Sequence, residues 1–320
     1  MMPHARAASL AQLGLILLTI GLGGCCRPSE RARVTTWKLA YGGRPRQVHV
    51  FIPRGHCPTA AVPLVVALHG GGGSGDRLDR ATGGTITRAA AARGWVVAFP
   101  SGVEARWNDG RSSSTAQRWA RADVDDVGFL QAVMDRAHEK LGIDLKQVYL
   151  TGISNGGFMA LRMAVEVPDR VAAVAAVTAT VSAPLGQRHP SAPVPVLFMN
   201  GTEDPIVPYD GGAVRVLGQE RGRIWSTKDS AQWWRKINGC TRPATHETLP
   251  DRVPEDGTRT YIERSTGCAS GAPVVVYRID GGGHTWPGGL QYAPRSAIGQ
   301  VARDFDGGHA IFEFFAALQR

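Results

Sequence analysis

The chain has 320 residues, of which 43% are hydrophobic and 20% are charged. This composition is typical of a globular protein and excludes a disordered tail or a collagen-like fibre. The 36 Lys and Arg residues exceed the 27 Asp and Glu residues, which gives a formal net charge of +9. The basic residues are scattered among acidic ones and no nucleic-acid motif is present, so we expect no nucleic-acid partner.

The first 25 residues have the organisation of an export signal. A short segment with Arg6 precedes the apolar run 13–20, and Leu22-Gly23-Gly24-Cys25 follows. The apolar run is shorter than the about 20 residues that a transmembrane helix needs. The last four residues resemble a bacterial lipobox, which implies that a lipid on Cys25 anchors the protein to a membrane of the cell envelope. The alternative is an ordinary cleaved signal and a secreted protein.

Export places the chain where disulfides persist. Cys240 and Cys268 bracket a segment rich in Pro, Asp, Gly and Thr between two ordered regions. A bond between them closes a loop of about 29 residues, which contributes on the order of 3 kcal/mol to stability by chain-entropy reasoning. We predict this disulfide. The sequence leaves the states of Cys26 and Cys57 open.

The body of the chain begins with a hairpin pattern. Residues 34–53 alternate apolar and polar side chains around Gly42-Gly43, which predicts an N-terminal antiparallel hairpin. Near-continuous apolar runs follow at 64–68, 95–99, 148–150, 194–199 and 274–277. Strands that are apolar on both faces belong to a sheet that is covered on both sides.

Helical patterns lie between these runs. The first, 127–141, has apolar residues at three- and four-residue spacing, with Asp123 in a position to cap its start. Further helices are predicted at 158–165, 231–237 and 310–318. The alternation of strands and helices indicates an α/β fold with a mostly parallel central sheet and helices on both faces. We expect one domain over 34–320, after a short tether at 26–33.

One strand ends in a candidate nucleophile. The run 148–151 leads into Gly152-Ile153-Ser154-Asn155-Gly156 and then a helix, which is the G-x-S-x-G pattern in its strand–turn–helix setting. The glycines are needed because the central residue sits on a tight, strained turn where a β-carbon two positions away would clash. Ser154 is therefore the candidate nucleophile. The alternative is a glycine-rich helix start with a capping serine.

A nucleophilic serine needs a base, which on this kind of fold is a histidine late in the chain. His284 lies in the glycine-rich loop 281–289, just after an apolar strand, where core packing explains a histidine poorly. We predict His284 as the general base. His246, in the polar segment, and His309, near the start of the last helix, are expected to be structural or surface residues.

The base needs a carboxylate to orient it. Asp204 is the candidate, because it lies on the loop beyond the carboxyl end of the strand 194–199, where sites form in open α/β sheets. Its neighbour Glu203 is the rival. Asp125 and Asp126 precede the serine, so their chain order disfavours them, and we expect them at the start of their own helix.

The tetrahedral intermediate of acyl transfer needs donors for its oxyanion. The segment 68–75, Leu-His-Gly-Gly-Gly-Gly-Ser-Gly, follows a strand and resembles the HGGG loop of esterases. We expect the backbone N–H groups of Gly71 and Asn155 to form the oxyanion hole. The alternative is a phosphate-binding loop, but no Lys-Ser or Lys-Thr follows and the G-x-G-x-x-G spacing does not fit.

Taken together, five segments resemble the secreted polyhydroxybutyrate depolymerase and feruloyl esterase family. They are Leu68–Gly75, Trp107–Gly110, Val124–Phe129, Gly152–Gly157 and Gly281–Gly288. The resemblance implies an α/β-hydrolase fold, a serine esterase mechanism, no cofactor, and the triad Ser154, Asp204 and His284. No cluster of residues suggests a metal site.

The chain departs from this family in two respects. Relatives often carry a cysteine where Gly71 stands and a cysteine pair after the Trp-Asn segment, and those positions here hold no cysteine. Depolymerases of solid polyester also carry a linker and a polymer-binding domain, for which this chain has no room after its last helix. We therefore expect an ester substrate that is soluble: feruloyl or acetyl esters of plant polysaccharide, or polyhydroxybutyrate-type oligomers. Trp107 and Trp286 are candidates for an aromatic wall against the substrate.

Two other functions remain as alternatives. A peptidase of the same fold is disfavoured because no substrate-gating domain accompanies the hydrolase core. A surface carbohydrate-binding protein without activity is disfavoured because Ser, Asp and His are all intact.

Overall fold

The structure is a computed structural model that describes residues 30–111 and 123–319. The predicted export signal, with Cys25, and most of the predicted tether lie outside these residues. Within the described residues, no helix is both long and apolar enough to cross a bilayer.

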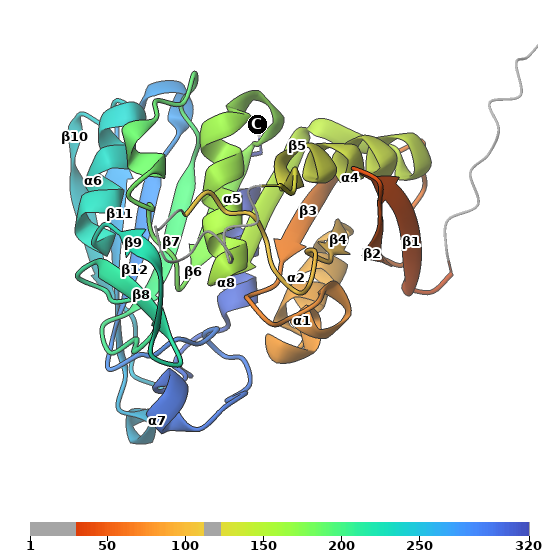
Figure 1. The fold of residues 1–320 in the computed structure, drawn as a ribbon. Helices are drawn as coiled ribbons and strands as arrows, with labels where there is room; N and C mark the ends of the chain where they lie inside the picture. The colour runs from red at the N-terminus through yellow and green to blue at the C-terminus, as the bar shows by residue number, and fades with distance from the viewer. Residues whose placement is uncertain (1–29, 112–122, 320) are drawn as a thin grey trace, which may run out of the picture.

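A mixed sheet forms the centre of the molecule (Figure 1), with strand order β1-β2-β4-β3-β5-β6-β7-β12-β11-β10 among the described residues. Neighbouring strands from β4 to β12 in this order run parallel. Antiparallel strands extend both edges. The strands are β1 (Arg33–Tyr41), β2 (Arg44–Ile52), β3 (Val62–Leu68), β4 (Val96–Pro100), β5 (Ile143–Ile153), β6 (Ala173–Val177), β7 (Val196–Gly201), β10 (Arg242–Thr248), β11 (Arg259–Thr266) and β12 (Val274–Asp280). The predicted parallel sheet and N-terminal hairpin are confirmed.

Helices cover both faces of the sheet (Figure 1), as the two-sided apolar strands require. On one face, α4 (Asp126–Leu141), α5 (Asn155–Glu166) and α6 (Thr227–Ile237) contribute buried side chains to one hydrophobic cluster. On the other, α1 (Gly75–Ala81), α2 (Thr85–Arg93) and α8 (Gly307–Ala316) contribute to a second. The shorter helices are α7 (Arg295–Ile298), η1 (Pro168–Arg170), η2 (Leu185–Gln187), η3 (Pro254–Asp256) and η4 (Ala269–Gly271).

The predicted cap of α4 was wrong by two residues. Asp125, not Asp123, caps the helix: its side chain accepts a hydrogen bond from the backbone N–H of Gly128 at 2.8 Å. Asp123 instead forms an exposed ion pair with Arg44 at 2.9 Å. An aspartate caps only when it directly precedes the first helical residue, and the apolar spacing alone did not locate that residue.

The polar segment between Cys240 and Cys268 was expected as an irregular excursion, but it holds β10 and β11. The two strands pair antiparallel and extend the sheet beyond β12. Because β10 is an exposed edge strand, its sequence has no apolar run that would predict it.

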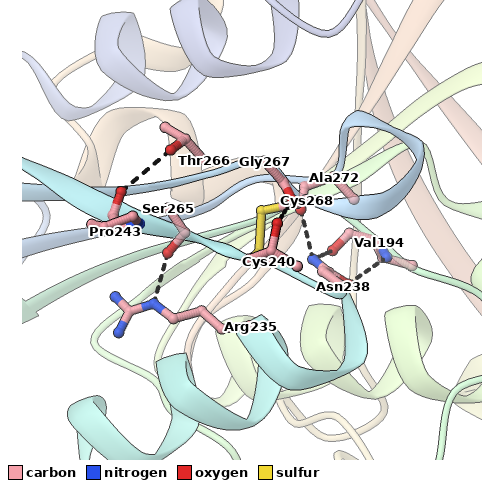
Figure 2. The surroundings of a disulfide bond; sticks show 11 residues. Val194, Arg235, Asn238, Cys240, Pro243, Ser265, Thr266, Gly267, Cys268 and Ala272 are labelled. Atoms are coloured by element: carbon pink, nitrogen blue, oxygen red, sulfur yellow. Dashed lines mark hydrogen bonds between the residues drawn. A yellow bond between two sulfur atoms is a disulfide. The ribbon is translucent and has the colours of Figure 1, made fainter.

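The predicted disulfide joins Cys240 and Cys268 at the end of this ribbon (Figure 2). Beside it, the amide of Asn238 donates to the carbonyls of Val194 and Ala272 at 2.8 and 3.0 Å. The disulfide therefore links the loop after α6 to the end of the antiparallel pair β10 and β11, which we call the edge ribbon. Cys57 is also disulfide-bonded.

A separate hairpin, β8 (Gly212–Val216) and β9 (Gln219–Ile224), lies outside the main sheet. It follows the loop after β7, so the chain leaves the sheet at the carboxyl ends of the parallel strands before it forms the hairpin. Val214 is buried and Val216 half-buried, while Leu217 at the tip is exposed.

Candidate active site

Ser154 occupies the strained turn that its sequence predicts. It lies between β5 and α5 with φ 54° and ψ −122°, a conformation that residues with a β-carbon rarely adopt. The glycines two positions before and after Ser154 allow this turn to pack closely on itself and on β3. A Cβ at Gly152 would lie 2.5 Å from the carbonyl carbon of Gly156, and a Cβ at Gly156 would lie 2.1 Å from the carbonyl oxygen of Leu68. The backbone N–H of Ser154 donates to Val177 on β6 at 2.9 Å.

Asp204 and His284 meet at the carboxyl edge of the sheet. Asp204 follows β7 and His284 follows β12, and these strands are parallel neighbours, so both loops leave the sheet at the same edge. His284 Nδ1 lies 2.7 Å from Asp204 Oδ2, and both side chains are buried. The other oxygen, Asp204 Oδ1, accepts hydrogen bonds from the backbone N–H groups of Ile206 and Val207, each at 2.8 Å. These two bonds hold the carboxylate in place against the imidazole.

Two hydrogen bonds also hold the backbone of the loop that carries His284. The N–H of His284 donates to the carbonyl of Ile298 at 2.6 Å, and the hydroxyl of Tyr292 donates to the carbonyl of His284 at 2.8 Å. Burial, and secondarily the charge of Asp204, raises the pKa of the Tyr292 phenol, so this phenol remains a donor at neutral pH.

Ser154 and His284 line one cavity of about 600 Å³. Much of its wall is apolar and comes from α1, β5, the loop after β7, the β8–β9 hairpin and α7. These apolar residues include Leu78, Ile153, Ile206, Val214 and Ile298. The cavity thus combines the candidate nucleophile and an Asp–His pair with room for an apolar acyl or alcohol group.

The glycine-rich loop after β3 lies beside Ser154. A Cβ at Gly70 would lie 3.6 Å from Ser154 Cβ, and a Cβ at Gly71 would lie 3.9 Å from Asn155 Cβ. The N–H groups of Gly72 and Gly73 are bonded to backbone carbonyls. Within the described residues, the N–H groups of Gly71 and Asn155 donate to no other group, as an oxyanion hole requires.

The side chain of His69 holds the glycine-rich loop after β3 in position through two hydrogen bonds. Its Nε2 accepts from the backbone N–H of Gly102 at 3.0 Å, so the proton is on Nδ1, which lies 2.7 Å from the carbonyl oxygen of Gly70. Burial lowers the pKa of His69 to about 4, so the ring is neutral at pH 7 and keeps both bonds. His69 is a positioning residue that the sequence analysis did not single out.

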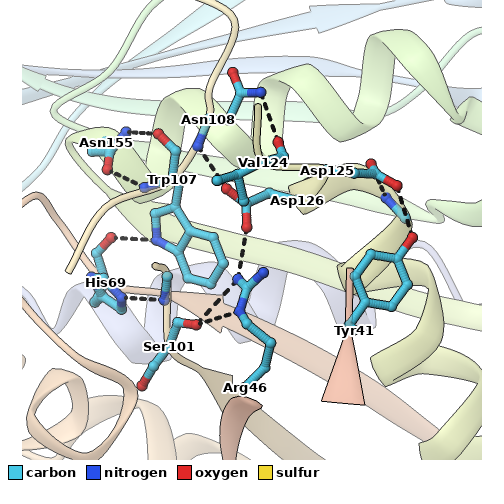
Figure 3. A network of polar contacts seen from close by, with 12 residues as sticks. Tyr41, Arg46, His69, Ser101, Trp107, Asn108, Val124, Asp125, Asp126 and Asn155 are labelled. Carbon is cyan, nitrogen blue, oxygen red and sulfur yellow. Dashed lines mark hydrogen bonds and ion pairs between the residues drawn. The ribbon is translucent and has the colours of Figure 1, made fainter. Parts of the chain in front are cut away.

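Asn155 is held by the loop 107–109 (Figure 3). Its side-chain oxygen accepts from the backbone N–H of Trp107 at 2.8 Å, and its side-chain nitrogen donates to Trp107 O at 3.1 Å and to Asp109 Oδ2 at 2.6 Å. These bonds orient Asn155, which lines the cavity and whose backbone N–H is one of the two expected oxyanion donors.

A buried ion pair supports that loop in turn (Figure 3). Asp126 Oδ2 accepts from the backbone N–H of Asn108, and Asp126 Oδ1 accepts from Arg46, each at 2.7 Å. The Arg46 and Asp126 side chains are 3% and 0% exposed. Burial, opposed by these partners, raises the pKa of Asp126. The segment Val124–Phe129 therefore supports the segment Trp107–Gly110, which in turn holds Asn155.

Trp107 and Trp286, the candidates for an aromatic wall against the substrate, are more deeply packed than expected. Trp107 and Trp286 reach the cavity, but they are only 1% and 2% exposed and belong to the two hydrophobic clusters. Their indole N–H groups donate to the carbonyl of His69 at 2.9 Å and to the hydroxyl of Thr85 at 3.1 Å. Neither ring has a face open to solvent, so each is primarily a packing residue.

The rival residues lie apart from the Asp–His pair. Glu203 points to solvent, His246 is exposed on β10, and His309 lies in the first turn of α8. In the part of the chain that the structure describes, no group of His, Cys, Asp and Glu residues is arranged to hold a metal ion.

The chain matches known esterases over most of its length. A family model described as "Putative esterase" matches residues 40–251. A relative named "Putative esterase NocK" from Nocardia uniformis subsp. tsuyamanensis is 33% identical over 297 residues, which are 90% of this chain and 84% of the relative. "Feruloyl esterase B" from Piromyces equi is 29% identical over 246 residues, which are 75% of this chain and 42% of that protein.

Among solved structures, the acetyl xylan esterase from Aspergillus awamori has a TM-score of 0.55 and 14% identity, over 88% of this chain and 99% of that one. At this identity the likeness shows the fold alone, which is the α/β-hydrolase fold. Together with the family match, these relationships show that the chain belongs to the esterase family and is a carboxylic ester hydrolase.

Proposed function

We propose that the chain is an exported serine esterase that works through an acyl-enzyme. In this proposal Ser154 is the nucleophile, His284 the general base and Asp204 the group that orients the base. One arrangement carries the proposal: a serine on a strained strand–helix turn shares a cavity with a histidine whose Nδ1 lies 2.7 Å from a buried carboxylate.

Acylation requires one proton to move twice. His284 Nε2 takes the proton of Ser154 Oγ as this oxygen bonds to the ester carbonyl carbon. The imidazolium then gives that proton to the alcohol oxygen as its bond to carbon breaks. Asp204, held by two backbone N–H groups, keeps Nδ1 protonated and stabilises the imidazolium without accepting the proton.

The carbonyl oxygen becomes negatively charged in each tetrahedral intermediate. In this proposal the N–H groups of Gly71 and Asn155 donate to it, and the closeness of the Gly70-Gly71 segment to Ser154 and Asn155 supports this assignment. Deacylation repeats the sequence with water: His284 takes its proton as the water oxygen attacks the acyl carbon, and the proton returns to Ser154 Oγ as the acid leaves.

For the substrate, we propose feruloyl or acetyl esters of plant polysaccharide, or oligomers of polyhydroxybutyrate type. The feruloyl esterase among the relatives and the largely apolar cavity support this class. The test is a panel of initial rates on p-nitrophenyl acetate and butyrate, methyl ferulate, acetylated xylan and 3-hydroxybutyrate oligomers. Preference for methyl ferulate, acetylated xylan or the oligomers would select one substrate within the class, and no hydrolysis of any of them would contradict it.

The mechanism is tested with a Ser154→Ala variant and an organophosphonate. We expect the variant to fold normally and to lose turnover by on the order of 10⁶. We also expect the organophosphonate to label the wild type stoichiometrically at Ser154 and the variant not at all. Ester hydrolysis that survives in Ser154→Ala would contradict the assignment.

We further propose that residues 1–25 direct export and that Cys25 receives a lipid. The sequence pattern supports this proposal, together with the disulfide between Cys240 and Cys268, because such bonds persist outside the cytosol. Fractionation of cells that express the full chain tests it: wild type should be found with membranes and Cys25→Ser should not. Equal distribution of the two proteins would contradict lipidation.

A further inference from the structure

One side of the cavity carries three arginines from separate parts of the chain. Arg106 and Arg111 flank the loop 107–109, and Arg221 lies on β9. We call Arg106, Arg111 and Arg221 the arginine wall. All three line the same cavity as Ser154 and His284.

The packing of β9 against the loop brings these side chains together. Gly222 has φ 96°, and a Cβ there would lie 3.2 Å from Arg111 Cβ. A side chain at position 222 would crowd Arg111 and would be strained at this φ, so glycine favours the close packing of the hairpin against this loop. Arg221, the neighbour of Gly222, is placed beside the loop that holds Arg106 and Arg111.

Arg111 is fixed in position. Its Nε and Nη2 donate to Asp109 Oδ2 at 2.9 and 2.6 Å, and its guanidinium lies 4.0 Å from the centre of the Phe158 ring. Asp109 also accepts from the side chain of Asn155, the residue after Ser154. A chain of contacts thus connects the arginine wall to the proposed oxyanion hole.

The described lining of the cavity carries an excess of positive charge. Among the described residues that line it are the arginine wall and the exposed Arg77, together with one acidic residue, Asp109. The pKa of Arg221 is lowered, first by burial and then by the positive charges of Arg106 and Arg111. The three side chains are therefore close enough to affect one another. Positive charges grouped in a partly buried cavity attract anions more strongly than charges in open solvent.

We propose that the arginine wall selects esters that carry a carboxylate group in addition to the ester that is cleaved. Such a substrate places its apolar chain against the apolar lining and its carboxylate beside the positive charge of the arginine wall, because guanidinium groups suit carboxylate oxygens in geometry. The carboxylate belongs either to the acyl side, as in a half-ester of a dicarboxylic acid, or to the alcohol side. This inference rests on the proposed serine esterase function and refines its substrate class.

The test compares pairs of esters that differ in one charge. For the acyl side, p-nitrophenyl hemiglutarate is compared with p-nitrophenyl valerate; for the alcohol side, 4-acetoxybenzoate is compared with phenyl acetate. The measured quantity is the ratio of kcat/KM for the anionic over the neutral ester. We expect a ratio of about ten or more in at least one pair at low salt, since charged hydrogen bonds of this kind are strong, and we expect it to fall in 1 M NaCl.

Variants assign the ratio to the arginine wall. Arg106→Gln and Arg221→Gln should each lower it by about tenfold, and Arg221→Lys, which keeps the charge, should retain most of it. Arg215→Gln is the matched control, because Arg215 lies exposed on β8 of the same hairpin and does not line the cavity. It should leave the ratio unchanged.

The outcomes separate the two proposals. A wild-type ratio of one or less in both pairs, or a ratio that both glutamine variants leave unchanged, would overturn the role of the arginine wall while leaving the esterase mechanism intact. Absence of hydrolysis of all four esters by the wild type would instead contradict the proposed function. If a glutamine variant fails to fold, the lysine variant and the salt dependence of the wild type decide the question.

Discussion

The side-chain amide of Asn155 donates a hydrogen bond to Asp109 Oδ2 at 2.6 Å, and both side chains are buried. The bond fastens the residue after the proposed nucleophile to the loop that carries Arg111. One polar contact therefore serves both the proposed oxyanion hole and the arginine wall.

This contact yields a first prediction. Asn155→Asp places two buried carboxylates against each other and displaces the adjacent N–H, so we expect kcat for a neutral ester to fall by about 100-fold, with a much smaller change in KM. The double variant Asn155→Asp with Asp109→Asn restores a donor and an acceptor across the contact and should recover part of the loss. A double variant no better than the single one would show that the contact does not act through its hydrogen bond.

A second prediction concerns the orienting carboxylate. Asp204→Asn keeps the shape of the side chain but cannot stabilise the protonated imidazole, and its amide favours the wrong tautomer of His284. We expect kcat to fall by about 10⁴ while the melting temperature stays close to that of the wild type. Glu203→Gln is the matched control, since Glu203 is the adjacent exposed acid, and should retain full activity. The assignment is wrong if the two variants lose activity equally.

A third prediction follows from the neutral His69. Its pKa is lowered to about 4 by burial, whereas a histidine in an unfolded chain has a pKa of about 6.5. Between these values the unfolded chain binds a proton that the folded chain does not, so acidification favours unfolding. His69 should therefore remove about 3 kcal/mol from the free energy of unfolding as the pH falls from about 6.5 to about 4.

Urea unfolding at pH 7 and pH 4 measures this loss. The decrease should be smaller in His69→Gln, which lacks the titrating ring, than in the wild type. The two proteins differ only at this ring, so the contributions of other groups cancel in the comparison. Equal decreases in both proteins would exclude His69 as the source.

A fourth prediction contrasts two ion pairs at the start of α4. Asp126→Asn leaves the buried Arg46 without its partner carboxylate and should cost about 3–5 kcal/mol of unfolding free energy. Asp123→Asn breaks the exposed pair with Arg44 and should cost less than about 1 kcal/mol. Both changes are measured by urea unfolding at pH 7. Similar costs would mean that the burial of the Arg46–Asp126 pair does not determine its contribution.

A fifth prediction concerns the edge ribbon. Replacing Cys240 and Cys268 together by Ser releases a closed loop of about 29 residues and should lower the free energy of unfolding by about 3 kcal/mol. Asp204 and His284 are held by other contacts, so kcat at 25 °C should be retained. A double variant as stable as the wild type, or one that loses kcat while folded, would contradict this account.

Sequence reasoning located the parts of the molecule that have local signatures. Ser154 was found because a strained turn demands glycine at fixed neighbouring positions, and the central strands were found because two-sided burial leaves continuous apolar runs. Asp204 and His284 were placed by chain order and by their loops at strand ends, and the structure brings them into contact.

What the sequence did not predict depends on contacts between distant segments or on exposed edges. The ribbon of β10 and β11 is polar because its outer strand faces solvent, so its pattern resembled a loop. His69 is fixed by a hydrogen bond from the backbone N–H of Gly102. Arg221 lies beside Arg106 because the β8–β9 hairpin packs against the loop 107–109. No local sequence pattern marks either contact. Trp107 and Trp286 line the cavity as expected, but the sequence does not show that their rings are packed in the two hydrophobic clusters and that their indole N–H groups have internal partners.

Because β7 and β12 are neighbours in the sheet, the contact between Asp204 and His284 does not depend on the length of the chain between them. Asp204 and His284 are 80 positions apart, yet their contact depends on two neighbouring strands and their short loops. Between these residues the chain forms the β8–β9 hairpin, α6 and the ribbon of β10 and β11, and then returns to the sheet as β12. A change in the length of the β8–β9 hairpin therefore leaves in place the two strands that carry these loops, which makes the hairpin a position where the preference of the enzyme for charged esters can be engineered.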